Sequence, residues 1–379
     1  MAIIFDGHHI VGGDPGDRVA PDFRLREFER ANGTVRVHRE LVSALQVLRD
    51  RFGASVRIAD MASGPGGART GLFAWVSARD PAALERAGRT LAAEGYFREV
   101  RRDGRTVFLD VGDPERLPPI SPAQTLQATV QVTAGFETSG DPFQQVTGNF
   151  DGAGLSFGPS QVNFGTGTLV PLFRAFQEAD EAALAACFTP PERYGEWLAI
   201  LGADPAEQVA WADRLSRGAR KHGFARSWKA CLQAVGRVAV FRDIMTGHAV
   251  SDYGARLARA LRWLHALEPL DVDHLTCLSA LYDLCTQQGS LDKAHEQIRA
   301  RVAAQRPGSQ FELVRIAVVE RGLTANPRWR ADCVSRRLTI LNRQPTAFTA
   351  DGVRARRTNR NVYLLRNVRI DDAAALRRA

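Results

Sequence analysis

The sequence predicts an α+β protein, mainly α, in which a small α/β domain is followed by a larger helical domain with one β-hairpin. Three observations lead to this fold class. Helical and strand patterns alternate over residues 22–112, helical spacing dominates after residue 168, and a short period-two pattern lies in a glycine-rich stretch between them. At 379 residues the chain exceeds one typical core, so two domains are expected.

The N-terminal part is predicted to contain an extended lead over residues 1–21, a compact domain over 22–112 and a linker over 113–123. Glycine and proline are frequent in the lead, and prolines in the linker favour a stiff spacer. Within the compact domain, apolar spacing predicts two helices and two strands. Their expected positions are 38–51 and 80–91 for the helices, and 56–58 and 107–111 for the strands.

The domain over 22–112 resembles the zinc D-alanyl-D-alanine carboxypeptidases of peptidase family M15. The stretches that carry the resemblance are 23–28, 39–49 and 55–58. That family holds its metal with a histidine and an aspartate in one segment and a second histidine on the closing strand. The stretches in these places, 63–76 and 107–111, contain no histidine, and a catalytic zinc needs three protein ligands. We therefore expect a pseudo-peptidase without metal or cofactor.

The remainder, residues 124–379, is expected to form the helical domain. Thr168 follows a glycine turn and is predicted to cap the first long helix, whose apolar residues share one face. Further helices are expected at 192–201, 205–217, 228–244, 255–267, 275–287, 292–304, 311–322 and 329–341.

Composition limits the classes of function. A hydrophobic share of 45% and a charged share of 24% are typical of a soluble globular protein. The sequence has no long apolar run and no signal peptide at its start, so we expect no membrane span and synthesis in the cytoplasm. The net charge of +8 suits a polyanionic partner, but no nucleic-acid-binding motif accompanies it, so nucleic acid is not an expected partner.

The stretch 136–168 is the candidate active site, because it places two acids in a polar, glycine-rich loop between apolar segments. Residues 124–137 can enter a core, so Glu137 would end a buried element, where desolvation raises the pKa of a carboxyl group. Alternation over 155–158 predicts short strands of a hairpin with Asp151 at its first bend, where the carboxylate stays ionised. Two carboxyl groups of different pKa are the acid and base that glycoside hydrolysis requires.

This stretch resembles the active-site hairpin of the chitosanase branch of the lysozyme superfamily. The resemblance is carried by Glu137 and by the run Asp-Gly-Ala-Gly-Leu-Ser at 151–156. It implies that Glu137 is the general acid, Asp151 the general base and Ser156 the hydroxyl that orients the attacking water. Leu155 departs from the family, which has an aromatic residue there, and the acid and base are closer in sequence than in those chitosanases.

Bacterial peptidoglycan-hydrolase-like proteins also resemble the chain, in the run 148–152, the Gln161-x-Asn163 step and the segment 281–290. This resemblance implies that Asn149, Gln161 and Asn163 bind substrate. Asp283 is expected to face the cleft as well and to pair with an arginine, because an arginine network behind the acid is a chitosanase feature. The candidate partners are Arg336 and Arg337, and a purely structural salt bridge is the alternative.

These residues lead to a functional hypothesis with open alternatives. The leading hypothesis is a muramidase-like glycoside hydrolase that cleaves β-1,4 bonds of peptidoglycan glycan strands by inverting acid/base catalysis. The alternatives are a chitosanase and a non-catalytic cell-wall-binding protein. Without a secretion signal, the protein would reach a periplasm or cell wall by phage-type lysis or as an antibacterial effector injected into a target cell. An immunity protein or a component of the secretion machine is then the expected protein partner.

Overall fold

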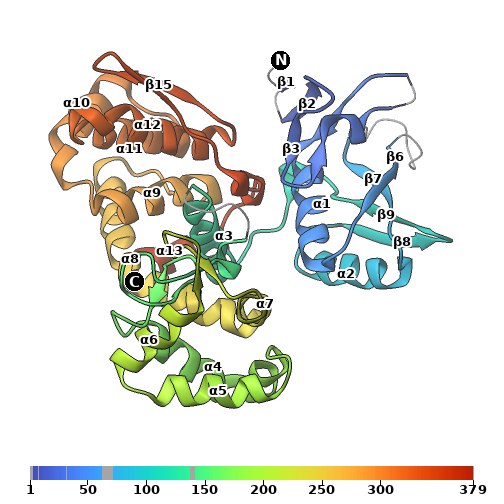
Figure 1. Cartoon of the computed structure of the whole chain (residues 1–379). Helices are drawn as coiled ribbons and strands as arrows, with labels where there is room; N and C mark the ends of the chain where they lie inside the picture. Colours follow the sequence, from blue (N-terminus) through green and yellow to red (C-terminus); the bar gives the residue numbers. More distant parts are fainter. Residues whose placement is uncertain (1–2, 7, 31, 62–70, 137–140, 379) are drawn as a thin grey trace.

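The computed structural model describes residues 3–6, 8–30, 32–61, 71–136 and 141–378, and these residues form three hydrophobic cores (Figure 1). One core belongs to the N-terminal α/β domain, drawn in blue to cyan. The other two belong to two lobes of the helical domain. Helices predominate over short strands, which confirms the α+β, mainly α, fold class.

In the N-terminal domain two helices pack on one face of a four-stranded antiparallel sheet of order β6-β7-β9-β8. Asp80 caps the second helix by accepting a hydrogen bond from the Ala83 amide at 2.9 Å, and Gly53 ends the first in the left-handed region at φ 71°. Four of these elements were predicted, namely α1 (Arg39–Phe52), β6 (Arg57–Asp60), α2 (Pro81–Ala93) and β9 (Thr106–Asp110). The strands β7 (Phe73–Ser77) and β8 (Glu99–Asp103) were not predicted.

The N-terminal lead and the linker both pack onto the domains beside them. In the lead, Ile10 and Ala20 join the N-terminal core. In the linker, Ile120 is buried, and its amide donates to the Arg369 carbonyl at 2.9 Å. The lead contains β1 (Ile4–Asp6), β2 (His9–Gly12) and β3 (Arg18–Ala20), and the linker contains η2 (Pro114–Arg116). Between the lead and α1 lie β4 (Phe23–Arg24), η1 (Leu25–Phe28) and β5 (Val37–His38).

The first lobe of the helical domain, called here the hairpin lobe, is drawn in green to yellow in Figure 1. A three-stranded antiparallel sheet, β10 (Val146–Thr147), β11 (Ser156–Phe157) and β12 (Val162–Asn163), packs with its helices around an aromatic core. The other elements are η3 (Pro142–Gln144), α4 (Leu169–Ala186), α5 (Glu192–Gly202), α6 (Pro205–Leu215), β13 (Ser216–Arg217), β14 (Gly223–Phe224) and α7 (Arg226–Val235).

The second lobe, the C-terminal lobe, contains most of the orange and red elements of Figure 1 together with α3 (Pro122–Ala134). Helix α8 (Ala239–Leu267) joins the lobes, since Phe241 and Met245 lie in the hairpin-lobe core and Leu261 and Leu264 in the other. The remaining elements are α9 (Leu275–Gln288), η4 (Asp292–Ala294), α10 (His295–Gln305), α11 (Gln310–Leu323), α12 (Pro327–Asn342), β15 (Ala347–Ala350), β16 (Val353–Arg356), η5 (Arg360–Leu364) and α13 (Ala373–Arg378).

Two helix predictions were wrong in detail. A single helix was expected over 228–244, but the chain breaks at Gly236 between α7 and α8. A Cβ atom at Gly236 would lie 2.1 Å from the Phe143 carbonyl oxygen, so this close approach requires glycine. The Thr168 side chain does not cap α4; its hydroxyl accepts from the Asn163 amide at 3.1 Å. The β15–β16 hairpin was not predicted.

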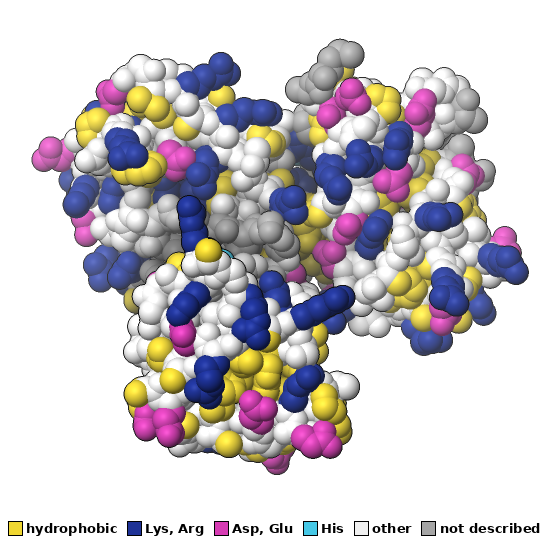
Figure 2. Space-filling view, viewed as in Figure 1, with side chains coloured by type: hydrophobic (Ala, Val, Ile, Leu, Met, Phe, Trp, Pro, Cys, Tyr) yellow, Lys and Arg dark blue, Asp and Glu magenta, His cyan; other side chains and the backbone are white. Residues whose placement is uncertain are grey.

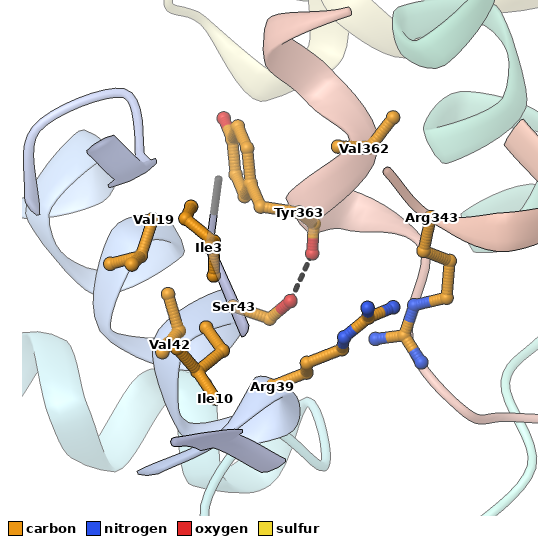
Figure 3. Close-up of a pocket in the computed structure, with 9 residues that line it drawn as sticks. All are labelled: Ile3, Ile10, Val19, Arg39, Val42, Ser43, Arg343, Val362 and Tyr363. Carbon is orange, nitrogen blue, oxygen red and sulfur yellow. Dashed lines mark hydrogen bonds between the residues drawn. The ribbon is translucent and has the colours of Figure 1, made fainter. Parts of the chain in front are cut away.

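The two domains meet at the buried carboxylate of Glu40, in the first turn of α1. Arg343 Nη2 and the Asn367 amide each donate to Glu40 Oε1 at 2.8 Å, and Arg366 Nε lies 3.5 Å from Oε2. Beside it, the Ser43 hydroxyl donates directly to the Tyr363 carbonyl, and both residues line a small cavity at the junction (Figure 3). The junction is therefore held by charged hydrogen bonds as well as by apolar contact.

We expect Glu40→Gln to lower the free energy of unfolding by about 1.5–3 kcal/mol near neutral pH, the range for hydrogen bonds to a charged group. Burial raises the pKa of Glu40, but Arg343, Arg366 and the Asn367 amide together hold it below its ordinary value of 4.5. The stabilisation is thus present above pH 4.5 and is lost as the pH falls through the lower folded pKa. Denaturant unfolding of both proteins at several pH values measures the difference.

The matched control is Glu94→Gln, which removes a more exposed ion pair with Arg51. Its effect should stay below about 1 kcal/mol, because exposed pairs contribute little. A difference between wild type and Glu40→Gln that stayed constant down to pH values well below 4.5 would contradict the role given to this carboxylate.

Among the described residues, no helix is both long enough and apolar enough to cross a membrane.

Candidate active site

Asp151 lies in the loop that connects β10 to β11, as predicted, and its side chain is exposed. One carboxylate oxygen, Oδ1, accepts a hydrogen bond from the Ala153 amide at 3.1 Å. Gly152 and Gly154 have φ values of 85° and 82°, in the left-handed region that favours glycine. The glycines thus bend the loop so that the carboxylate is presented to solvent.

Asn149 fixes the base of this loop, a role that the sequence did not predict. Its side-chain oxygen accepts from the Gly154 amide at 2.8 Å, and its Nδ2 donates to Asp213 Oδ1 at 2.6 Å. Its own amide donates to Ser216 Oγ at 2.8 Å. Asn149 was expected to bind substrate, but these contacts make it a brace that ties the Asp151 loop to the end of α6.

Asp213 is a site residue that sequence reasoning missed. Its Oδ1 accepts hydrogen bonds from both the Asn149 side-chain amide and the Lys221 ammonium, at 2.6 Å and 2.5 Å. The hydrogen bond from Lys221, followed by that from Asn149, lowers the pKa of Asp213. The brace is therefore charged at neutral pH and helps to hold the loop. No local signal marks Asp213, because its partner lies 64 residues away.

A second hairpin, β13–β14, packs directly against the Asp151 loop. The Gly148 amide donates to the His222 carbonyl at 3.2 Å, and a Cβ atom at Gly148 would lie 2.4 Å from the Gly223 carbonyl oxygen. Next to Asp151, Phe150 is 41% exposed and its ring stacks on His222, with ring centroids 4.6 Å apart. The candidate site thus includes an exposed aromatic pair that the sequence did not predict.

Ser156 differs from its expected role. It lies on β11, opposite Thr147 and Asn163, and only 3% of its surface is exposed. The residues on both sides of Ser156 are buried as well, so the period-two pattern does not leave one face of the strand open. The Ser156 hydroxyl is therefore enclosed in the small sheet and does not reach the surface where Asp151 lies.

Gln161 and Asn163 form the turns around β12. Asn163 Oδ1 accepts from the Thr166 amide at 2.8 Å, and its Nδ2 donates to the Gln161 carbonyl at 3.2 Å. Gln161 has a left-handed φ of 49° and an exposed side chain. The amide of Asn163 is thus used within the turn, contrary to the substrate-binding role expected for it, whereas the Gln161 side chain stays accessible.

Glu137, the expected acid, lies outside the described residues, so its position relative to Asp151 stays a prediction. The described residues on either side belong to different lobes. Phe136 follows α3 and has the guanidinium of Arg336 over its ring, 4.2 Å from the centroid. Asp141 begins the hairpin lobe, where it pairs with Arg242.

Asp283 pairs with both candidate arginines, as predicted. Its Oδ1 lies 2.9 Å from Arg336 Nη2, and its Oδ2 lies 3.2 Å from Arg337 Nε. All three side chains are at most 2% exposed, and Arg336 also donates to the Thr133 carbonyl at 3.1 Å. The expectation that Asp283 faces a cleft and touches substrate was wrong, because the two guanidinium groups enclose it. It braces α9, α12 and the end of α3.

The expected relic metal site is described only in part, because residues 62–70 lie outside the described residues. Within the part of the chain that the structure covers, no group of three or more histidine, cysteine or acidic side chains is arranged to hold a metal ion.

No protein family model, curated protein or solved structure matches this chain. The resemblances to lysozyme-superfamily enzymes and to M15 peptidases therefore stay predictions. The functional argument depends on the geometry of the chain itself.

Proposed function

We propose that the protein is a muramidase-like glycoside hydrolase that cleaves β-1,4 bonds in peptidoglycan. In this proposal Glu137 protonates the leaving oxygen and Asp151 activates the attacking water. The observation that carries it is the placement of Asp151: an exposed carboxylate on a glycine-shaped loop that Asn149 and Asp213 hold in place. A general base needs this combination of access to water and fixed position.

The two-lobed helical domain supports the proposal. Asp151 belongs to the hairpin lobe, whereas α3, the helix that precedes residue 137 in the sequence, belongs to the C-terminal lobe. Carboxyl groups on opposite lobes can flank a glycan strand, and an inverting mechanism needs about 6.5–9.5 Å between them to admit water. The buried pair of Arg336 with Asp283 braces the end of α3, the described element that precedes residue 137 in the sequence.

The site of action and the partners are part of the same proposal. The enzyme would act on cell wall in a periplasm, delivered by lysis or by a secretion machine, and an immunity protein would block the site in the producing cell. The N-terminal domain would act as a non-catalytic support, joined through Glu40.

A non-catalytic wall-binding protein is the second candidate. The observation that favours it is that Ser156, the hydroxyl expected to orient the attacking water, is enclosed in the small sheet with only 3% of its surface exposed.

Turbidity loss of purified peptidoglycan tests the proposal. The wild-type protein should clear the suspension, and Glu137→Gln should slow clearing by about 10²-fold or more, because the amide cannot donate the proton. Glu178→Gln, an exposed change on α4, is the matched control and should clear normally. Mass spectrometry of the products identifies which sugar carries the new reducing end. Equal clearing by wild type and Glu137→Gln would show that Glu137 is not the acid, and no clearing by either protein would favour the wall-binding function.

A further inference from the structure

The segment 214–222 on and around the β13–β14 hairpin is strongly basic. It contains Arg214, Arg217, Arg220 and Lys221 and no acidic residue, and all four cationic side chains are exposed. Lys221 pairs with Asp213, whereas the three arginines make no ion pair within the described part of the chain. We call Arg214, Arg217 and Arg220 the basic hairpin. Its charges are available to a ligand.

The basic hairpin adjoins the Asp151 loop. The two are in backbone contact at Gly148 and His222, where the amide-to-carbonyl distance is 3.2 Å, and the stacked rings of Phe150 and His222 connect their surfaces. A ligand bound beside Asp151 therefore meets an exposed aromatic ring and several positive charges. An aromatic ring of this kind offers an apolar face to the C–H groups of a sugar.

Charge is unevenly distributed over the hairpin lobe. In Figure 2 lysine and arginine side chains gather over the upper part of this lobe, toward the other lobe and domain, whereas acidic side chains gather at its lower end. This separation favours an anionic ligand on the upper part of the lobe, because a surface of one sign attracts the opposite charge and repels its own.

We propose that the basic hairpin and Phe150 form a binding subsite for a carboxylate-bearing glycan, which selects peptidoglycan over chitosan. This proposal rests on the proposed function and deepens it. Peptidoglycan carries free carboxylates on its stem peptides, whereas chitosan carries ammonium groups at the pH values where it dissolves. Guanidinium groups beside the scissile bond attract the first polymer and repel the second. The subsite therefore sets the substrate class that the acid/base pair alone leaves open.

The test is co-sedimentation of the full-length protein with purified sacculi that are free of teichoic acid. Asp151→Asn is the background, so that the glycan is not consumed during the measurement. Adding Arg214→Gln, Arg217→Gln and Arg220→Gln should weaken binding by about 10-fold or more at low salt, within the range by which charged surfaces concentrate ligands. The effect should shrink as salt is added. Thermal unfolding checks that the triple variant stays folded.

The matched control replaces Arg354, Arg356 and Arg360, which are exposed on the C-terminal lobe, by glutamine in the same background. Equal loss of binding in both triple variants would overturn the proposal, because only total charge would then matter. Sacculi whose carboxyl groups have been converted to amides should bind the background protein as weakly as the basic-hairpin variant does. Unchanged binding to the amidated sacculi would also overturn it.

Two further outcomes separate this proposal from others. Binding of soluble chitosan as tight as that of sacculi would overturn the selection for carboxylates, and displacement from sacculi by low concentrations of duplex DNA would favour a nucleic-acid ligand instead.

The subsite proposal and the proposed function can also fail separately. If wild type hydrolyses no glycan but sacculus binding still depends on the three arginines, the proposed function fails and the subsite stands. If the wild type hydrolyses glycan and replacing the three arginines does not change sacculus binding, the proposed function stands and the subsite proposal fails.

Discussion

Asp151→Asn should lower the rate of peptidoglycan hydrolysis by about 10²–10⁴-fold, the usual contribution of a positioned acid or base. The substitution keeps the size of the side chain and an oxygen that can accept the hydrogen bond now made by Ala153, at 3.1 Å. It removes the group that would take a proton from water. The initial rate of release of reducing ends from purified peptidoglycan measures the effect, and thermal unfolding checks that the loop change leaves the protein folded.

Asp243→Asn is the matched control, because Asp243 is an exposed aspartate on α8 for which we propose no catalytic role. Its rate should equal that of the wild type. If Asp151→Asn retained the wild-type rate, Asp151 would not be the base, and the loop would have a structural role only. If both variants lost activity, the loss would reflect a change in stability or surface charge, and Asp151 could not be assigned as the base.

The elements predicted correctly are those fixed by local sequence. The Asp151 bend is marked by the glycines around it, and α1 ends at Gly53 because the chain there adopts a left-handed conformation. The break between α7 and α8 could not be predicted in this way. Apolar spacing continues through Gly236, and the break becomes understandable only when the Phe143 carbonyl is found against it.

The candidate site was predicted only in part, for the same reason. Asp151 was placed at a bend by its neighbours in sequence, but the residues that hold the loop come from 213–224, which tertiary packing brings beside it. Amide side chains such as Asn149 were assigned to substrate because their type suits sugars. Their backbone and carboxylate partners, known only from the structure, use the same hydrogen-bonding groups.

Asp283→Asn should destabilise the protein by about 3–5 kcal/mol, the cost of breaking a buried ion pair by removing one partner. Asp283 is fully buried, and its carboxylate is the negative charge between the guanidinium groups of Arg336 and Arg337. The neutral amide would remove the buried negative charge that faces both guanidinium groups. Denaturant unfolding measures the loss, which should appear as a lower midpoint with little change in slope.

Asp351→Asn provides the matched control, since it removes the same charge from a partly exposed pair with Arg330, in which 46% and 32% of the two side chains are accessible. Its cost should be below about 1 kcal/mol. The comparison also separates two roles for Asp283. A residue that touched substrate would lose hydrolysis while the unfolding midpoint stayed near that of wild type. A residue that only braces α9, α12 and the end of α3 would behave differently. Its loss would lower the free energy of unfolding, and activity would fall only under conditions in which part of the protein is unfolded.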